Sequence, residues 1–492
     1  MTETTDRRSH ARPRAASGTS GRGDGRAEEN VSGKSLDSGR GRVSRRLPRR
    51  RTKLIVGGVA FGVVLLIVGA LGVVRSNSSE PGAGRQPTAA LPAAVSGRAP
   101  GASLEDLISS LQARLEATPG DYVSWATLGL AYVQQARISV DPAYYPRAEG
   151  ALERSLDIDT ANNFIAYAGL SALASARHDF VVAKEHAETG LQINAYSSLL
   201  YGALSDAEVQ LGNYDAAFDA VQKMIDLSPD TSSLSRASYT WELRGDLDRA
   251  ARLMQRALDD APNPEDRAFA LFQLGELEFN AGNPNAALEH YLASLSASPD
   301  NPAALAGKAR ALAALGQIET ALDTYAALVE RAPEPTYLLE YGELLESLGR
   351  TSEAEAQYEI FAVTQQLFAA NGVQPDAVLA LFHADHGDPI VALAAAEEAF
   401  SDNPFLTVED ARAWALHRNG RDEEALAAVD RALSFGYRNA RFHYHAGMIS
   451  LALGDEGRAR DELSTALEIN PYFNPLEAET ARSTLATLGE AP

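Results

Sequence analysis

Residues 269–299 read FALFQLGELEFNAGNPNAALEHYLASLSASP and contain the pattern that decides the fold. Apolar side chains recur at helical spacing on both sides of Gly282, and Pro299 stands where the next helix must begin. Glycine permits the backbone conformation that ends a helix, and proline is tolerated only at a helix start. The stretch therefore predicts two short helices joined by a turn.

The same helix-turn-helix unit repeats along most of the chain. An alanine is expected just before each second helix, at Ala148, Ala183, Ala217, Ala250, Ala287, Ala321, Ala354, Ala392, Ala425 and Ala459. Successive alanines lie 33 to 38 residues apart. Five residues before them, the last eight units carry a glycine at Gly212, Gly245, Gly282, Gly316, Gly349, Gly387, Gly420 and Gly454. Such a period predicts stacked repeats that share one core.

The repeat resembles the tetratricopeptide family, whose unit has about 34 residues. The first unit matches the family pattern at Trp125, Leu128, Gly129, Tyr132, Ala148 and Leu152, with about seven extra residues in its turn. The resemblance covers about residues 103–489. It implies an all-α fold, a right-handed α-solenoid of about ten helix-turn-helix units, in a bacterial membrane-anchored member of the family.

Capping helices are expected at both ends of the array, because a solenoid exposes apolar surface there. Residues 103–119 begin with a capping box from Ser103 to Asp106 and have leucines along one side. Residues 475–492 contain the matching C-terminal helix and tail. The repeat array itself is expected over residues 120–474.

The resemblance implies a concave groove that binds an extended or helical peptide. Its inward positions are expected to hold Tyr239, Glu242, Phe269, Phe272, Glu276, Phe279, Glu343, Glu346, Trp414, Tyr444 and Met448. Aromatic anchors with flanking charges suit a peptide partner. Apart from Arg310, Arg418 and Arg441 the charged groove residues are acids, which favours a basic or apolar segment. The alternative is that half of these side chains belong to the core between repeats.

No catalytic motif is present in the sequence: there is no P-loop, no G-x-G-x-x-G opening a βαβ unit, no G-x-S-x-G and no H-E-x-x-H. The protein is therefore expected not to be an enzyme and to need no cofactor. The alternative is an extracytoplasmic accessory protein that binds a divalent metal, because His383, Asp385 and His386 cluster in HADHGD. Spacing alone does not supply a complete ligand set.

Residues 54–74, LIVGGVAFGVVLLIVGALGVV, form an uncharged run long enough for a helix to cross a bilayer. Four basic residues between Arg49 and Lys53 precede the run, whereas Arg75 alone follows it directly. The positive-inside rule then predicts a single-pass signal-anchor in the cell inner (plasma) membrane, with a cytoplasmic N-terminus and an extracytoplasmic repeat body. A cleaved signal peptide is the alternative, which the length of the run disfavours.

The segments beside this run are poor in apolar residues. Residues 1–53 carry 15 Lys and Arg against 6 Asp and Glu, and they are expected to be a disordered basic arm in the cytoplasm. Residues 75–102 are rich in Pro, Gly, Ser and Ala, as in a flexible linker. Gly58 and Gly62 form a G-x-x-x-G spacing through which two anchors could pair as a homodimer.

The part of the chain after Arg75 is strongly acidic, with 28 Lys and Arg against 60 Asp and Glu. Like charge repels the phosphate backbone, so nucleic acid is not expected as a partner. The chain has no cysteine, which excludes disulfides and thiolate metal sites. The sequence therefore predicts a membrane-tethered scaffold or adaptor that binds protein or peptide partners, whose identity it does not give.

Overall fold

The computed structural model describes residues 104–489, where all regular structure is helical. This part of the chain has 22 α-helices, one short 3-10 helix (Pro142–Tyr144) and no β-strand, which confirms the predicted all-α fold. The predicted arm, anchor and linker, the Gly58 and Gly62 pair, and Ser103 lie outside the described residues. None of the helices between 104 and 489 is both long and apolar enough to cross a membrane.

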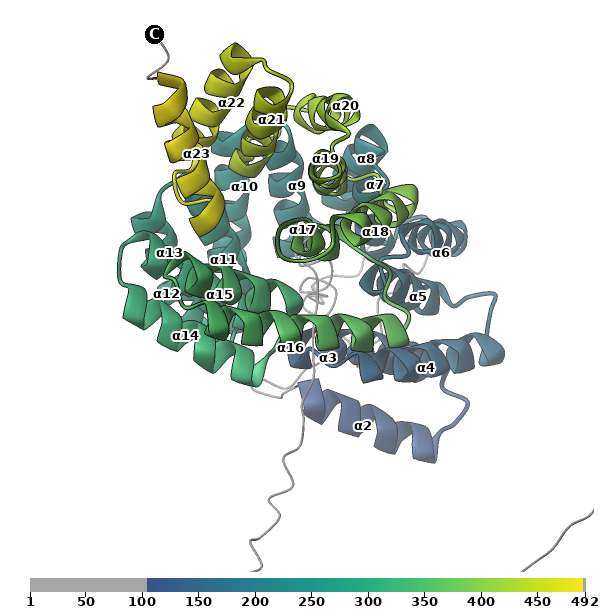
Figure 1. Ribbon diagram of the computed structural model, residues 1–492. Coiled ribbons are helices and arrows are strands. Elements are labelled where there is room, and N and C mark those ends of the chain that lie inside the picture. Colours follow the sequence, from purple (N-terminus) through teal and green to yellow (C-terminus); the bar gives the residue numbers. More distant parts are fainter. Residues whose placement is uncertain (1–103, 490–492) are drawn as a thin grey trace, which may run out of the picture. The chain divides into compact units, whose positions relative to one another are not determined.

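Ten helix pairs follow one another between two terminal helices, α2 (Leu104–Ala117) and α23 (Pro475–Gly489) (Figure 1). The first helix of each pair, helix A, is α3 (Tyr122–Ser139), α5 (Phe164–Ala176), α7 (Ser198–Gln210), α9 (Thr231–Leu243), α11 (Pro264–Asn280), α13 (Pro302–Ala314), α15 (Pro335–Ser347), α17 (Ala377–His386), α19 (Leu406–Arg418) and α21 (Ala440–Ala452). The second, helix B, is α4 (Tyr145–Ile158), α6 (Phe180–Ile193), α8 (Tyr214–Leu227), α10 (Leu247–Asp259), α12 (Pro284–Ala297), α14 (Ile318–Arg331), α16 (Thr351–Ala370), α18 (Pro389–Asp402), α20 (Asp422–Leu433) and α22 (Glu456–Ile469).

The repeating alanines lie inside helix B and not before it, which corrects the predicted helix start. Each alanine is the fourth residue of its helix, and none is more than 1% exposed. The helices start earlier because start signals already stand in the turns. Asp246 accepts the backbone N–H of Arg249 at 3.0 Å, and Pro284 occupies the first turn of α12.

A large side chain of helix B packs against glycines of helix A. Tyr291 of α12 lies between Gly275 and Gly307, and a Cβ at either glycine would come 2.5 Å from its ring. Leu152 of α4 lies in the same way beside Gly129, where a Cβ would come 2.5 Å from its Cγ. Only glycine leaves room for such a contact. The contact therefore fixes how closely helix B approaches helix A and the helix A that follows.

The array curls so that distant pairs touch. The turn between α5 and α6 meets the linker after α16, where the Gln374 N–H donates to the Arg177 carbonyl at 3.0 Å. The turn between α7 and α8 meets the start of α19, where the Leu406 N–H donates to the Tyr214 hydroxyl at 3.2 Å. In each case the linker follows the fifth pair further along the chain.

The same pairing continues towards the C-terminus. A Cβ at Gly245, between α9 and α10, would come 2.5 Å from the carbonyl oxygen of Gly436, which follows α20. Asn470, which follows α22, donates its Nδ2–H to the carbonyl of Phe279 in α11 at 2.9 Å. We call this row of contacts the seam. It joins the second to fifth pairs to the linkers after the seventh to tenth pairs.

Left-handed residues mark the turns within the pairs. Seven of the eight predicted turn glycines have positive φ, and Gly387 is the exception with φ of −132°. His178 takes the left-handed position in the second pair, with φ of 62°. Its Nδ1 lies 3.2 Å from the Gln374 carbonyl, so a non-glycine residue at this position contacts the seam.

Replacing Gly245 with alanine should destabilise the protein more than the same change at Gly316. Both glycines have φ of 75°, so both variants carry left-handed strain of about 1–2 kcal/mol. A new Cβ meets the seam at Gly245, whereas nothing lies within 4 Å of one at Gly316. Urea titration followed by circular dichroism is expected to give free energies of unfolding that differ by about 1–3 kcal/mol. Equal losses would contradict the seam.

Candidate functional site

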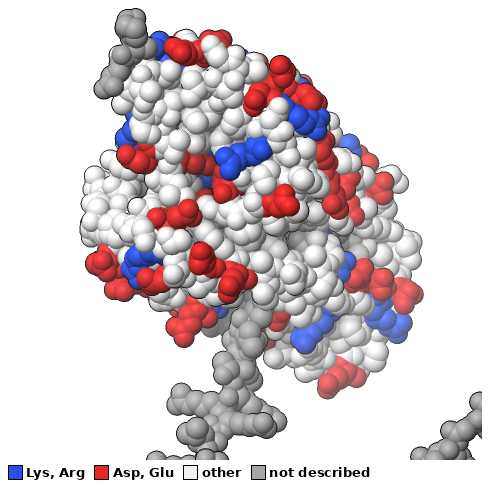
Figure 2. All heavy atoms as spheres, viewed as in Figure 1, with Lys and Arg blue, Asp and Glu red and all other residues white. Residues whose placement is uncertain are grey.

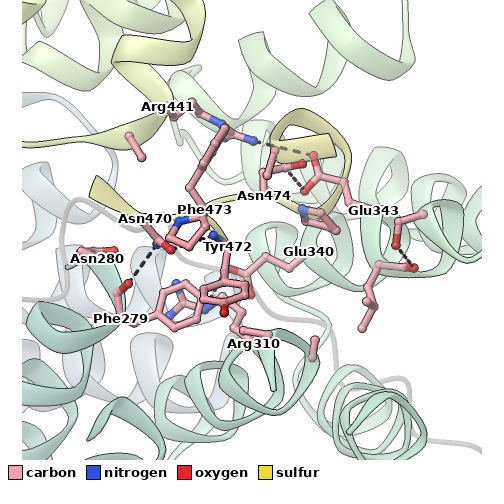
Figure 3. A pocket seen from close by; sticks show the side chains of 18 of the residues that line it. Phe279, Asn280, Arg310, Glu340, Glu343, Arg441, Asn470, Tyr472, Phe473 and Asn474 are labelled. Carbon is pink, nitrogen blue, oxygen red and sulfur yellow. Dashed lines mark hydrogen bonds and ion pairs between the residues drawn. The ribbon is translucent and has the colours of Figure 1, made fainter. Parts of the chain in front are cut away.

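A half-open cavity of about 470 Å³ lies where the end of the array meets its middle (Figure 3). Helices α13, α15 and α17 form one wall, residues 437–441 form a second, and the linker 470–475 between α22 and α23 forms a third. Helix α23 also packs against α15. The volume falls in the range of about 300–1,000 Å³ that is common for ligand pockets.

Two asparagines fix the linker 470–475 against helix A of two earlier pairs. Asn470 Nδ2 donates to the Phe279 carbonyl at 2.9 Å, and Asn474 Nδ2 donates to Glu343 Oε2 at 2.9 Å (Figure 3). The Asn474 Oδ1 also caps α23 by accepting two of its backbone N–H groups, at 2.8 and 3.0 Å. The linker is therefore attached near both of its ends.

Arg310 of α13 lies in the cavity wall between two carboxylates. Its guanidinium is 2.6 Å from Glu276 Oε1 and 3.6 Å from Glu340 Oε1. The Tyr291 hydroxyl donates to Glu276 at 2.6 Å, and the Tyr325 hydroxyl donates to Glu340 at 3.0 Å. Burial raises the pKa of Glu340, and the nearby arginine opposes that rise. Two carboxylates therefore share the single guanidinium group of Arg310.

Arg441 of α21 has the same arrangement on another wall. Its guanidinium lies 2.8 Å from Glu477 and 3.9 Å from Glu343. Burial opposes the charge of Glu477, but Arg441 and His445 hold its pKa at about 2. His386 lies 3.5 Å from Glu343; burial lowers the pKa of this histidine, but the carboxylate outweighs burial and raises it.

His445 is completely buried between two carboxylates. Its Nδ1 is 3.0 Å from Asp410, and its Nε2 is 3.9 Å from Glu477. The Trp414 ring stacks on the imidazole at 4.4 Å between centroids, and its Nε1–H donates to Asp385 at 2.8 Å. Burial alone would lower the pKa of His445, but Asp410 and Glu477 raise it to about 9. This histidine is therefore charged at neutral pH.

The predicted groove residues are divided between the cavity and the core. Phe279 and Glu343 line the cavity, and Glu276 lies behind Arg310. The buried aromatic members that pack away from the cavity are Phe269, Phe272, Trp414 and Tyr444. The half-buried members are Tyr239, Glu242, Glu346 and Met448. Burial raises the pKa of Glu242 to about 7, and the Glu276 carboxylate adds to the rise.

The side chains of the metal alternative have different partners. Asp385 accepts the Trp414 hydrogen bond, whereas His386 faces Glu343. Burial lowers the pKa of His383. In residues 104–489 no group of three or more His, Asp or Glu side chains could hold a metal ion. The metal-binding alternative therefore has no support in this part of the chain.

Sequence reasoning placed Arg310 and Arg441 in the groove but missed several cavity residues. Glu340 lies three residues before the predicted Glu343 on α15, so helical spacing could have found it. Tyr472 and Phe473 could not be found in this way. They belong to a linker whose position depends on the curvature of the whole array.

Acidic side chains are spread widely over the face of the molecule in Figure 2, with basic ones among them. Several form exposed ion pairs at the start of a helix B, where the residue before the helix pairs with one in its first turn, such as Arg350 with Glu353 at 2.6 Å and Arg421 with Glu424 at 2.6 Å. Exposed pairs of this kind contribute little to stability. No broad basic patch is visible on that face.

Comparison with known families shows that the chain contains tetratricopeptide repeats. Family models of this repeat match residues 199–231, 244–302, 278–339 and 411–472. No curated protein matches the chain.

Similar solved structures include other repeat proteins. A tetratricopeptide repeat protein from Parabacteroides merdae is 21% identical over 53% of this chain and 99% of its own, with a TM-score of 0.31. Human IFIT1, as a dimer with PPP-AAAA, is 14% identical over 74% of this chain and 86% of its own, with a TM-score of 0.41. Yeast Tom70 is 13% identical over 73% of this chain and 96% of its own, with a TM-score of 0.30.

Replacing His445 with glutamine should give a loss of stability that depends on pH. The folded pKa of about 9 exceeds the ordinary value of 6.5, so the charged histidine stabilises the fold fully below about pH 6.5. This contribution, on the order of 3 kcal/mol, is lost as the pH rises through about 9. Urea titrations at several pH values should therefore show the difference from the wild type shrinking across this range. His290→Gln on α12 is the control, and a pH-independent difference for His445→Gln would contradict the assignment.

Proposed function

We propose that the protein is a membrane-tethered scaffold whose repeats bind a protein or peptide partner on the extracytoplasmic side. Its tetratricopeptide repeats make a scaffold suited to protein–protein interaction. The cavity is the observation that carries the proposal, because Leu348 and Tyr472 line it and remain 41% and 39% exposed. Large apolar side chains exposed together in a concave site favour a partner that covers them.

The membrane tether rests on the sequence. Residues 54–74 are apolar and long enough to span a bilayer, and the basic residues before them favour a cytoplasmic N-terminus. The linker 75–102 would then separate the repeats from the bilayer surface. The proposed role is binding and organisation, and it requires no chemical reaction at the cavity.

A photo-crosslinking amino acid at Leu348 should capture a discrete partner in intact cells. The matched control is Leu292 on α12, which is 46% exposed and does not line the cavity. Both positions replace an exposed leucine, so the comparison isolates location. Cross-linked products are separated by electrophoresis and identified by mass spectrometry. Products of the same kind and yield at both positions would contradict binding at the cavity.

The proposed topology predicts which single-cysteine variants react with a membrane-impermeant maleimide. The natural chain has no cysteine, so each variant carries one reactive thiol. Ser296→Cys, exposed on α12, should be labelled in intact cells with an accessible outer surface. Ser17→Cys in the N-terminal arm should be labelled only after lysis. The reverse pattern would place the repeats in the cytoplasm.

A further inference from the structure

The cavity is lined by both apolar and charged side chains, which we call its apolar side and its charged side. The apolar side comes from Ile318 at the start of α14, Leu339 and Leu344 of α15, and Val378 and Leu381 of α17. Tyr472 and Phe473 of the linker complete it, and both are labelled in Figure 3. Apolar surface gains free energy when a ligand removes it from water. The ligand should therefore contain at least one large apolar group.

The charged side disfavours an acidic ligand. Arg310 and Arg441 are its guanidinium groups, and each is already paired with two carboxylates. Four carboxylates therefore surround these two guanidinium groups, but Glu477 also has the charged His445 beside it and Glu343 has His386 beside it. Two of the four, Glu340 and Glu343, line the cavity itself. Glu340 shares the Arg310 guanidinium with Glu276, so an additional anion would be repelled beside Glu340, whereas a cation would be attracted there.

The remaining arginines do not reverse this preference. Arg438 is exposed, and Arg482 has a side chain that is 44% exposed and lies 3.2 Å from Glu479. The Arg482 guanidinium also donates to the Pro471 carbonyl at 2.5 Å. Both arginines line the solvent side of the cavity, where water screens their charge. The pair of carboxylates around Arg310 is therefore the part of the site that favours a cation.

We propose that the cavity binds a segment of a partner polypeptide that carries a large apolar side chain next to a lysine or arginine. The apolar side chain lies against Leu339, Leu344 and Tyr472, and the basic group lies at Glu340 and Glu343. This inference rests on the proposed scaffold function and specifies its partner. Burial raises the pKa of Glu340, and a bound cation would lower that pKa again, so binding relieves an unfavourable charge.

The test uses three fluorescein-labelled peptides that differ at one position: Gly-Ser-Leu-Phe-Lys-Leu-Ser-Gly and its variants with Gln or Glu in place of Lys. Fluorescence polarisation with the full-length chain measures the three dissociation constants at pH 7. The Lys peptide is expected to bind about 10-fold more tightly than the Gln peptide, and the Glu peptide more weakly than both. Raising the salt concentration should narrow these differences.

Variants separate the charged and apolar contributions. Glu340→Gln should bring the Lys and Gln peptides within about 3-fold of each other. Tyr472→Ala should weaken the binding of both peptides by a similar factor and leave the ratio of their dissociation constants unchanged, because it removes contact area but no charged group. Glu359→Gln, an exposed carboxylate on α16 outside the cavity, is the matched control and should change neither value.

The outcomes distinguish this inference from the scaffold proposal. Equal binding of the three peptides, tighter binding of the Glu peptide, or no binding of any peptide would overturn the inference. Partner capture at Leu348 and not at Leu292 would leave the scaffold proposal standing in each of those cases. A ratio that Glu359→Gln alters as much as Glu340→Gln would also overturn the assigned position of the basic group.

Discussion

The contact between a helix B tyrosine and the glycines of helix A is the interaction on which the rest of the structure depends. Tyr291 fits between Gly275 and Gly307 only because neither residue has a side chain, and this sets the spacing of neighbouring pairs. The same ring places its hydroxyl 2.6 Å from Glu276, which pairs with Arg310. Two more helix B tyrosines donate to inner carboxylates: Tyr325 to Glu340 and Tyr358 to Glu346. Repeat packing therefore also orients the charged groups at the site.

The contacts of the seam hold the linker 470–475 against the middle of the array, and the cavity lies between them. In a solenoid each unit normally contacts only its neighbours, so stability is built from local interfaces. This array adds contacts between units five apart, and the linker 470–475 reaches α11 and α15 through two asparagine side chains. Buried polar groups such as Asn470 favour one arrangement because their hydrogen bonds are lost in any other. The position of the cavity walls is thus determined by long-range hydrogen bonds as well as by local packing.

Much of the fold could be predicted from the sequence, because the same alanine and glycine positions recur in successive units. The alanine and glycine positions gave the helix pairs, although Ala321 and its equivalents lie three residues inside helix B. The site was harder. Arg310 and Glu343 were found because helix A positions face inward in every unit. Phe272 and Trp414 occupy the same inward positions of helix A but are buried in the core. Spacing along one helix does not show which of its side chains the neighbouring helices cover. The position of Tyr472 in the cavity depends on the nearby hydrogen bond between Asn470 and Phe279, which are 191 residues apart. No local sequence pattern predicts a contact over that separation.

The seam also limits how the chain could change in length. Each contact of the seam joins one helix pair to the linker that follows the helix pair five units later. The first of these contacts joins Arg177 to Gln374, and the last joins Phe279 to Asn470. Inserting or deleting one whole unit between the partners would shift every contact of the seam by one repeat. The residues then brought together would not form the same hydrogen bonds. His178 would meet a linker without Gln374, and Asn470 would no longer reach Phe279. An open solenoid can gain or lose units with little effect on its remaining contacts, whereas a change in the number of units here would break the hydrogen bonds of the seam.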